Sequence, residues 1–108
     1  MPEKKKDNRE KYNEVYKIVA LIPKGKVITY GQLAMMVGGI TARQAGYAMR
    51  TAPPGLPAHR VVNSLGKLAP EYVFGSQEFQ RKRLEKEGIT FTAAGNIHMK
   101  KHLWTFEL

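Results

Sequence analysis

Two residues of this sequence, His59 and Glu87, are of the types that general acid–base chemistry combines. A histidine oriented by a carboxylate can exchange a proton near neutral pH, as a hydrolase or a glycosylase requires. The residue before the histidine is Ala58, and the sequence contains no cysteine. A reaction that needs a thiolate acceptor therefore has no residue to carry it.

Metal and disulfide chemistry have little support in the sequence. The absence of cysteine excludes disulfide frameworks and thiolate zinc sites. His98 and His102 lie four residues apart, but in a segment that we predict to be an extended hairpin rather than a helix, which makes a shared metal ion improbable. We expect no metal and no cofactor.

The composition indicates one small globular domain with a strongly basic surface. The chain has 108 residues, 43% of them hydrophobic, and a formal net charge of +9. Such a charge is typical of proteins that bind nucleic acid in a salt-dependent way, although a solubilising lysine coat has the same composition. No apolar run is long enough for a membrane span or a secretory signal. We expect disorder over residues 1–8, a single domain over residues 9–108, and a cytoplasmic location.

Apolar periodicity predicts a first helix over residues 8–22. Its apolar side chains recur at helical spacing on one face, at Tyr12, Val15, Tyr16, Val19 and Ile22. The sequence Pro-Lys-Gly at 23–25 should end this helix. Residues 26–29 then read as a short extended or turn segment.

Two capping boxes follow and predict a pair of short helices. Thr29 and Gln32 precede an apolar run at 33–37, and Thr41 and Gln44 precede residues 45–50. The glycine pair at 38–39 allows a sharp bend between the two helices. This pattern is typical of a helix-turn-helix, although any small helical hairpin would share it.

The rest of the chain predicts short extended segments and one further helix. β-Branched residues favour a strand through 60–63, a loop follows over 65–76, and a helix should run from near 76 to Gly88, with Glu78 and Lys82 placed to pair on it. Residues 89–92 and 97–104 read as a hairpin that would form a wing. The predicted fold class is α+β, mainly helical: a winged helix-turn-helix-like DNA-binding domain with a short β-hairpin.

The second helix of the motif, at 41–50, is rich in small side chains. Such residues let a helix approach another surface closely, whether that surface is a neighbouring helix or DNA. Arg43, Tyr47 and Arg50 fall near one face. Helices that read bases in the major groove usually carry more polar side chains, so the composition favours shape-based binding, which could include the minor groove.

Four segments resemble the O6-alkylguanine-DNA alkyltransferase family. Residues 27–34 are similar to the segment whose tyrosine turns the phosphate of the target nucleotide, and residues 42–50 resemble the recognition helix whose arginine fills the base stack. Residues 57–62, Pro-Ala-His-Arg-Val-Val, are similar to the active-site sequence Pro-Cys-His-Arg-Val-Val. Residues 86–88 match the helix end that provides the glutamate of a Cys-His-Glu relay. Together these motifs span about residues 10–92, most of the chain.

The sequence departs from that family at two positions. Ala58 replaces the acceptor cysteine, which points to the alkyltransferase-like subgroup, where this position is usually tryptophan or alanine. Ala52 stands where active transferases often have an asparagine that braces the site. The resemblance therefore implies a protein that is not an enzyme. Without a sulfur to activate, His59 and Glu87 are interpreted as structural or pocket-wall residues, and Arg60 as structural.

The resemblance also implies two groups of site residues. The predicted DNA-contacting residues are Tyr30, Thr41, Ala42, Arg43, Gln44, Ala45, Gly46, Tyr47 and Arg50, although Tyr30 has a competing interpretation as a core aromatic. The predicted pocket for an extruded base is formed by Pro57, Ala58, His59, Arg60, Val61, Tyr72, Phe74, Gly75 and Ser76.

These assignments predict recognition of O6-alkylguanine in double-stranded DNA by nucleotide flipping from the minor groove. Flipping costs a few kcal/mol and less where pairing is already damaged, and Arg43 could offset part of the rest. Ala58 is smaller than cysteine and leaves room for an alkyl group. The resemblance further implies that a monomer marks the lesion for nucleotide-excision repair proteins.

Two other functions are compatible with parts of this pattern. A winged helix-turn-helix transcriptional regulator would bind a preferred operator, usually as a dimer, but it gives no reason for the stretch at 57–60. An enzyme that uses His59 and Glu87 as acid and base would release a free base or an alcohol from modified DNA.

Overall fold

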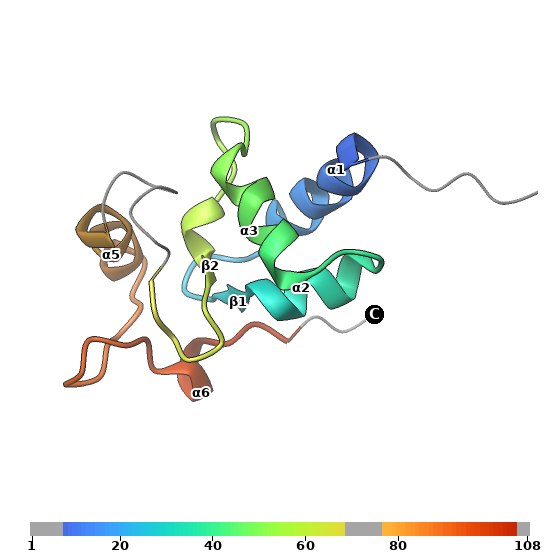
Figure 1. Cartoon of the computed structure of the whole chain (residues 1–108). Helices are drawn as coiled ribbons and strands as arrows, with labels where there is room; N and C mark the ends of the chain where they lie inside the picture. Colours follow the sequence, from blue (N-terminus) through green and yellow to red (C-terminus); the bar gives the residue numbers. More distant parts are fainter. Residues whose placement is uncertain (1–7, 69–76, 106–108) are drawn as a thin grey trace, which may run out of the picture.

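The computed structural model describes residues 8–68 and 77–105 (Figure 1). Within these residues the chain forms α1 (Asn8–Val19), β1 (Ile28–Thr29), α2 (Tyr30–Val37), α3 (Ala42–Arg50), the 3-10 segment η1 (Ala58–Arg60), β2 (Val61–Val62), α5 (Gln77–Lys86) and α6 (Met99–His102). The mainly helical α+β architecture agrees with the predicted fold class. None of the helices in the described ranges is long and apolar enough to cross a membrane.

The first helix buries the face that the sequence predicts, but it is shorter than expected. Val15 and Val19 are fully buried, whereas the α-helix ends at Val19 rather than at Ile22. The amides of Leu21 and Ile22 bond to carbonyls three residues back, a tighter turn that leads the chain into Pro23. Ile22 still reaches the core at 2% exposure.

Both predicted capping boxes are present and define the helix-turn-helix pair. The Thr29 hydroxyl accepts from the Gln32 amide at 3.0 Å, and the Thr41 hydroxyl accepts from the Gln44 amide at 3.1 Å. The turn between α2 and α3 uses glycines with positive φ, 78° and 75° at positions 38 and 39. Lys11, which the sequence analysis overlooked, donates to the Gly39 carbonyl at 2.8 Å and ties α1 to this turn.

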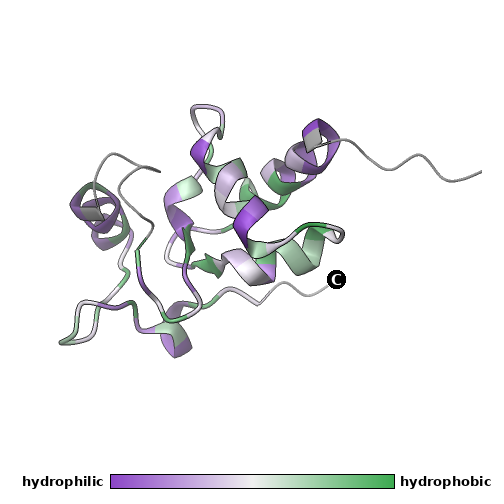
Figure 2. Ribbon diagram, in the orientation of Figure 1, coloured by the Kyte–Doolittle hydropathy of each residue, from purple (hydrophilic) through white to green (hydrophobic). Residues whose placement is uncertain are grey.

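Two short strands pair in parallel behind the helix-turn-helix. Ile28 lies opposite Val61 and Thr29 lies opposite Val62. The predicted strand at 60–63 is confirmed only at 61–62, because Ala58–Arg60 closes into a 3-10 turn in which the Arg60 amide donates to the Pro57 carbonyl at 3.0 Å. Figure 2 shows both strands coloured hydrophobic, in keeping with their burial.

The third predicted helix is confirmed as α5. Gly88 follows it with a φ of 89°, and the exposed pair of Glu78 and Lys82 forms at 3.3 Å. The side chains of Leu84, Ile89 and Ile97 join a second small core with Val27 and Val62. Helix α5 therefore packs on η1 and contributes Leu84 to this second core.

The predicted wing is only partly a hairpin. The Thr92 amide bonds to the Asn96 carbonyl, the His98 amide bonds to the Thr90 carbonyl, and Phe91 bridges Ile97. The predicted second strand over 97–104 is wrong beyond that point, because residues 99–102 form helix α6. After α6 the backbone turns to β1 instead: Val27 donates to the His102 carbonyl and accepts from the Trp104 amide.

Candidate nucleic-acid interface

Helix α3 has one packed face and one open face. Ala45, Ala48 and Met49 are buried and pack in the core shared with α1 and α2. The predicted contact residue Ala45 is therefore a core residue whose fully buried side chain does not reach the surface. The residues of the open face recur at helical spacing: Ala42, Arg43, Gly46, Tyr47 and Arg50. Thr41 is exposed at the start of this helix, and Gln44, half-buried, is held by its capping bond.

Gly46 is the one glycine inside α3, and the fold does not require it. A Cβ added there would meet no other atom within 4 Å. Glycine in a helix interior costs about 1 kcal/mol relative to alanine, so packing and propensity both favour a larger residue here. A glycine on the open face leaves room for a surface outside the chain to approach the helix backbone.

Arg43 and Tyr47 interact along the open face. The guanidinium Nε donates to the Tyr47 hydroxyl at 3.3 Å, and the guanidinium carbon lies 5.8 Å from the ring centroid. This contact holds a long cation along the helix instead of leaving it to sample many rotamers. The arginine is thus placed beside the gap that Gly46 and Ala42 leave.

Tyr30 begins α2 and is packed inward. Its ring lies against the main core cluster, and its hydroxyl oxygen is buried. This placement agrees with the competing interpretation of Tyr30 as a core aromatic. A contact between this side chain and a phosphate stays a prediction.

Charge is distributed so that the helix-turn-helix of α2 and α3 carries no carboxylate. Residues 15–70 include no aspartate or glutamate, whereas they include basic residues on α1, α3 and the connecting loops. The acidic residues of the described ranges lie on α1, at Glu10 and Glu14, and along or just after α5. A polyanion that approaches α3 therefore meets no repelling side chain from the helix-turn-helix.

The second candidate region is a hydrogen-bonded cluster around Glu87. His59 Nε2 lies 3.0 Å from Glu87 Oε2, and Arg60 contacts both carboxylate oxygens, with Nε 2.9 Å from Oε1 and a terminal nitrogen 2.6 Å from Oε2. The other terminal nitrogen of Arg60 donates to the Ile22 carbonyl at 2.7 Å. Glu87 follows α5 directly, so this cluster joins the ends of α5 and α1 to η1. These contacts agree with the structural interpretation of Arg60.

Burial and these bonds set the ionisation of the cluster. Desolvation would raise the pKa of Glu87, but hydrogen bonds from Arg60 and His59 outweigh it and lower the pKa to about 2. Desolvation also lowers the pKa of His59, against the raising effect of Glu87. At neutral pH the cluster therefore holds a carboxylate, a guanidinium and a neutral imidazole.

The neutral imidazole of His59 presents a bare acceptor toward the interior. Since Nε2 shares its hydrogen with the ionised Glu87, Nδ1 carries a lone pair. That nitrogen is buried and has no hydrogen-bond partner within residues 8–68 and 77–105. Proteins rarely leave a buried polar atom without a partner, and such an atom generally binds a water molecule or a ligand. The site can therefore accept a hydrogen bond, but the adjacent Ala58 methyl offers nothing to form a covalent bond.

The predicted pocket residues divide into three groups. Pro57 and Arg60 are half-buried, while Ala58 and His59 are 7% and 3% exposed. Val61 differs from its predicted role, because its side chain is fully buried in the core. The third group lies outside the described residues: Tyr72, Phe74, Gly75 and Ser76.

Gln80 is a residue of this region that the sequence analysis missed. It is fully buried on α5 and donates to the His59 carbonyl at 2.9 Å and to the Val61 carbonyl at 3.4 Å. These bonds fix the backbone of η1 and β2 on either side of Arg60. A glutamine in a charged helix gives no signal in the sequence that it points inward.

The positions of the histidines show which potential metal ligands lie near one another. No group of three potential metal-ligating side chains occurs among the residues that the structure describes. His98 and His102 do approach one another, because both lie 2.9 Å from the Thr90 hydroxyl. They are bound by that hydroxyl, and the His102 ring also contacts the Gly25 carbonyl at 3.3 Å.

The chain is similar in sequence and structure to known DNA-binding proteins. Residues 10–89 match the family model described as 6-O-methylguanine DNA methyltransferase, DNA binding domain. The chain is 38% identical over 102 residues to alkyltransferase-like protein 1 of Schizosaccharomyces pombe, an alignment that covers 88% of this chain and 94% of that protein. It is 39% identical over 95 residues to a DNA base-flipping protein of Vibrio parahaemolyticus, covering 84% and 92%. The crystal structure of S. pombe Atl1 in complex with damaged DNA containing O6-carboxymethylguanine superposes with a TM-score of 0.76 at 37% identity, covering 90% of this chain and 96% of that one.

Proposed function

The chain belongs to the family of the 6-O-methylguanine DNA methyltransferase DNA-binding domain, and from this premise we propose that it binds O6-alkylguanine in duplex DNA without removing the alkyl group. The observation that carries the proposal is the neighbourhood of Ala58. An inert methyl group stands beside an intact, buried cluster of His59, Arg60 and Glu87. The surroundings of a reactive site are present and the reactive atom is not.

Transfer of an alkyl group needs a nucleophile that keeps it. The reaction breaks the bond between the guanine oxygen and the alkyl carbon and forms a bond from that carbon to a thiolate sulfur. This chain has no cysteine at any position, and the side chain at 58 has no lone pair. Arg60 and His59 hold the ionised Glu87, so that carboxylate is engaged in charge-assisted bonds. The protein therefore binds the lesion non-enzymatically.

The open face of α3 supplies the contact with DNA. Ala42 and Gly46 let the helix backbone approach the minor groove, which is about 6 Å wide. Arg43, held along the same face by Tyr47, fills the space in the base stack when the damaged nucleotide leaves it. Thr41, Gln44 and Arg50 lie on or beside this face and contact the DNA backbone, and Tyr30 contacts it when its buried hydroxyl turns outward.

The extruded base enters the region of Ala58. Flipping costs a few kcal/mol and less when pairing is already weakened, so an alkylated guanine leaves the stack more readily than an intact one. The small side chain of Ala58 leaves room for the alkyl group, and the unpartnered Nδ1 of His59 provides a polar atom in this wall. The predicted pocket also includes Tyr72, Phe74, Gly75 and Ser76, which lie outside the described residues.

A bound lesion that is not repaired serves as a platform. The protein acts as a monomer in the cytoplasm, or at the nucleoid in a prokaryote, and nucleotide-excision repair proteins act on the complex. The support for this step is chemical: with no acceptor in the chain, removal of the lesion requires another protein.

A binding comparison at fixed salt tests the proposal. Two duplexes of the same sequence, one with a single O6-methylguanine and one with guanine, are titrated with the protein and followed by fluorescence anisotropy. The proposal expects the modified duplex to bind at least about tenfold more tightly, which is about 1.4 kcal/mol. Equal affinity for the two duplexes would overturn it.

A further inference from the structure

A hollow lies between the 90–98 turn and α6. It has a volume of about 600 Å³ and is lined by Thr90, Thr92, Ile97, His98, Met99, Lys100 and Lys101. Its surface is mostly apolar. The proposed contacts with DNA leave this hollow unused.

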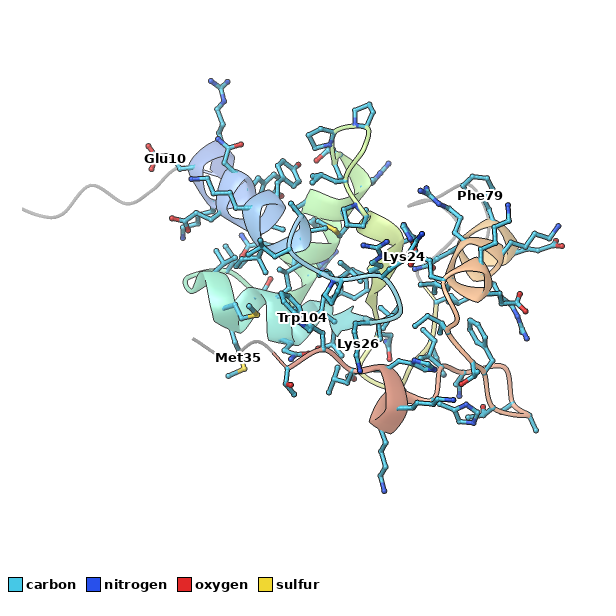
Figure 3. The ribbon with its side chains drawn as sticks, turned by 180° about the vertical axis from the view of Figure 1, so that it is seen from behind. Glu10, Lys24, Lys26, Met35, Phe79 and Trp104 are labelled. Carbon is cyan, nitrogen blue, oxygen red and sulfur yellow. The ribbon has the colours of Figure 1, made fainter. Side chains whose placement is uncertain are left out.

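Cations gather around the hollow without carboxylates to neutralise them. Lys100 and Lys101 are exposed, and Lys26 donates to the Lys101 carbonyl at 3.4 Å, which brings a third ammonium to the same side. Figure 3 shows Lys26 beside α6. Residues 88–106 contain no aspartate or glutamate, and none of these three lysines pairs with a carboxylate in the ranges that the structure describes.

The pKa of His102 is affected by two of these lysines. Burial lowers the pKa of His102, and the charges of Lys101 and Lys26 lower it further. Like charges held together raise the free energy of the folded chain unless an anion neutralises them. The hollow therefore has the electrostatic character of a site for a negatively charged partner.

The position of the hollow separates it from the proposed DNA face. In Figure 1, α3 lies above the strand pair β1–β2 and α6 lies below it. The hollow also has an apolar lining, whereas phosphates are bound by polar donors and helix ends. A phosphodiester backbone would leave this apolar surface uncovered.

From these observations we propose that the hollow beside α6 binds an acidic segment of a partner protein, in which one apolar side chain is flanked by carboxylates. The apolar side chain enters the space lined by Ile97 and Met99, and the flanking carboxylates meet Lys100, Lys101 and Lys26. Burial of one aromatic or leucine side chain contributes about 1.5–3 kcal/mol, and the charge complement speeds association and selects acidic partners. The proposal extends the proposed function by naming a surface that stays accessible while α3 occupies DNA.

The test uses the free protein and a short fluorescein-labelled peptide in which one phenylalanine is flanked by glutamates. Two control peptides replace the phenylalanine by serine or all glutamates by glutamines. The protein variant carries Lys100→Glu and Lys101→Glu. A matched variant carries Lys17→Glu and Lys82→Glu, which change the net charge by the same amount on the exposed surfaces of α1 and α5. Circular dichroism confirms that both variants fold.

The expected result is saturable binding of the first peptide by the unchanged protein. Each control peptide should bind at least about tenfold more weakly, as should the first peptide to the Lys100/Lys101 variant, while the matched variant loses at most about threefold. Equal losses in the two variants, or no difference between the peptides, would overturn the proposal.

A DNA titration of the same variants separates the two proposals. The Lys100/Lys101 variant should keep its preference for the O6-methylguanine duplex, with a loss in total DNA affinity no larger than that of the matched variant. A selective loss of DNA binding would show that this face contacts DNA instead and would overturn the proposed protein partner. If the unchanged protein binds the O6-methylguanine duplex and the unmodified duplex with equal affinity, the proposed function is wrong, but the peptide result still holds.

Discussion

Arg60 donates hydrogen bonds to both carboxylate oxygens of Glu87, at 2.9 Å and 2.6 Å, and these bonds link η1 to the end of α5. The arginine side chain is 14% exposed and the glutamate side chain 10%. A bidentate pair at such low exposure, reinforced by His59, is a structural clamp. It holds the backbone on both sides of Ala58 in place whether or not chemistry takes place there.

Glu87→Gln should destabilise the fold. The change removes the charge that Arg60 and His59 share, and hydrogen bonds to charged groups are worth about 1.5–3 kcal/mol each, so a loss of about 2–4 kcal/mol in the free energy of unfolding is expected. Urea denaturation measures it. Glu85→Gln is the matched control, because Glu85 is 51% exposed and forms an exposed pair with Arg81 at 3.4 Å; its loss should stay below about 0.5 kcal/mol. Equal losses would contradict the clamp.

Stability should decline on acidification in two steps. The folded pKa values of His59 and His102 lie below the ordinary 6.5, so below neutral pH the unfolded chain binds more protons than the folded one and the free energy of unfolding falls. Glu87 adds a second loss as the pH falls from about 4.5 toward its folded pKa of about 2. Chemical denaturation across this range measures both steps.

The variants assign the two steps to their groups. Glu87→Gln should remove most of the lower step, and His102→Gln should make the upper one shallower. A free energy of unfolding that stays constant from pH 7.5 to pH 5 would contradict the lowered pKa values of the two histidines, since protons should be taken up on unfolding there.

Gly46→Ala separates folding from binding. Because a Cβ at this position meets no atom, the helix should gain up to about 1 kcal/mol of stability. The same methyl group projects from the open face of α3 and should weaken DNA binding by about fivefold or more. Thermal unfolding and DNA anisotropy measure the two effects. A more stable protein with unchanged DNA affinity would place the DNA elsewhere.

Arg43→Ala should reduce the preference for the lesion. If the guanidinium fills the vacated stack, its loss weakens binding to the O6-methylguanine duplex more than binding to the unmodified one, by about tenfold in the ratio. Changing Lys4, Lys5 and Lys6 to alanine removes more positive charge and should weaken both duplexes alike. A larger effect of the tail changes on the ratio would favour simple charge attraction.

Local signals in the sequence predicted the helix-turn-helix well. The two capping boxes involve residues three apart, so the hydrogen bonds of Thr29 and Thr41 follow from the sequence with little help from the rest of the fold. The ion pair of Glu78 with Lys82 is equally local. The family resemblance placed Ala58 beside His59 and Glu87 before any distance was known.

Features that depend on distant contacts were not predictable. The parallel pairing of Ile28 with Val61 has no pattern in strands of two residues. The segment after His98 reads as a strand in the sequence, but residues 99–102 form a helical turn. The backbone of His102 and Trp104 then bonds to Val27 instead of to the 89–92 segment. Tertiary hydrogen bonds decided the local conformation there.

Two of the predicted site residues are buried in the core. Ala45 and Val61 lie in matching family motifs, but the packing of α3 on α1 and of β2 on β1 turns both side chains into the core. The inward position of Gln80 follows from the backbone carbonyls of His59 and Val61, which need a donor once they are buried. Neither effect is visible without the three-dimensional arrangement.

Recovery of the complex formed on an O6-methylguanine duplex tests the central claim most directly. After prolonged incubation, the DNA is digested to nucleosides and the protein is weighed intact by mass spectrometry. The account predicts that all of the O6-methylguanine is recovered from the bound DNA and that the protein mass is unchanged. Loss of the modified base from the DNA, together with a protein heavier by one methyl group, would contradict it.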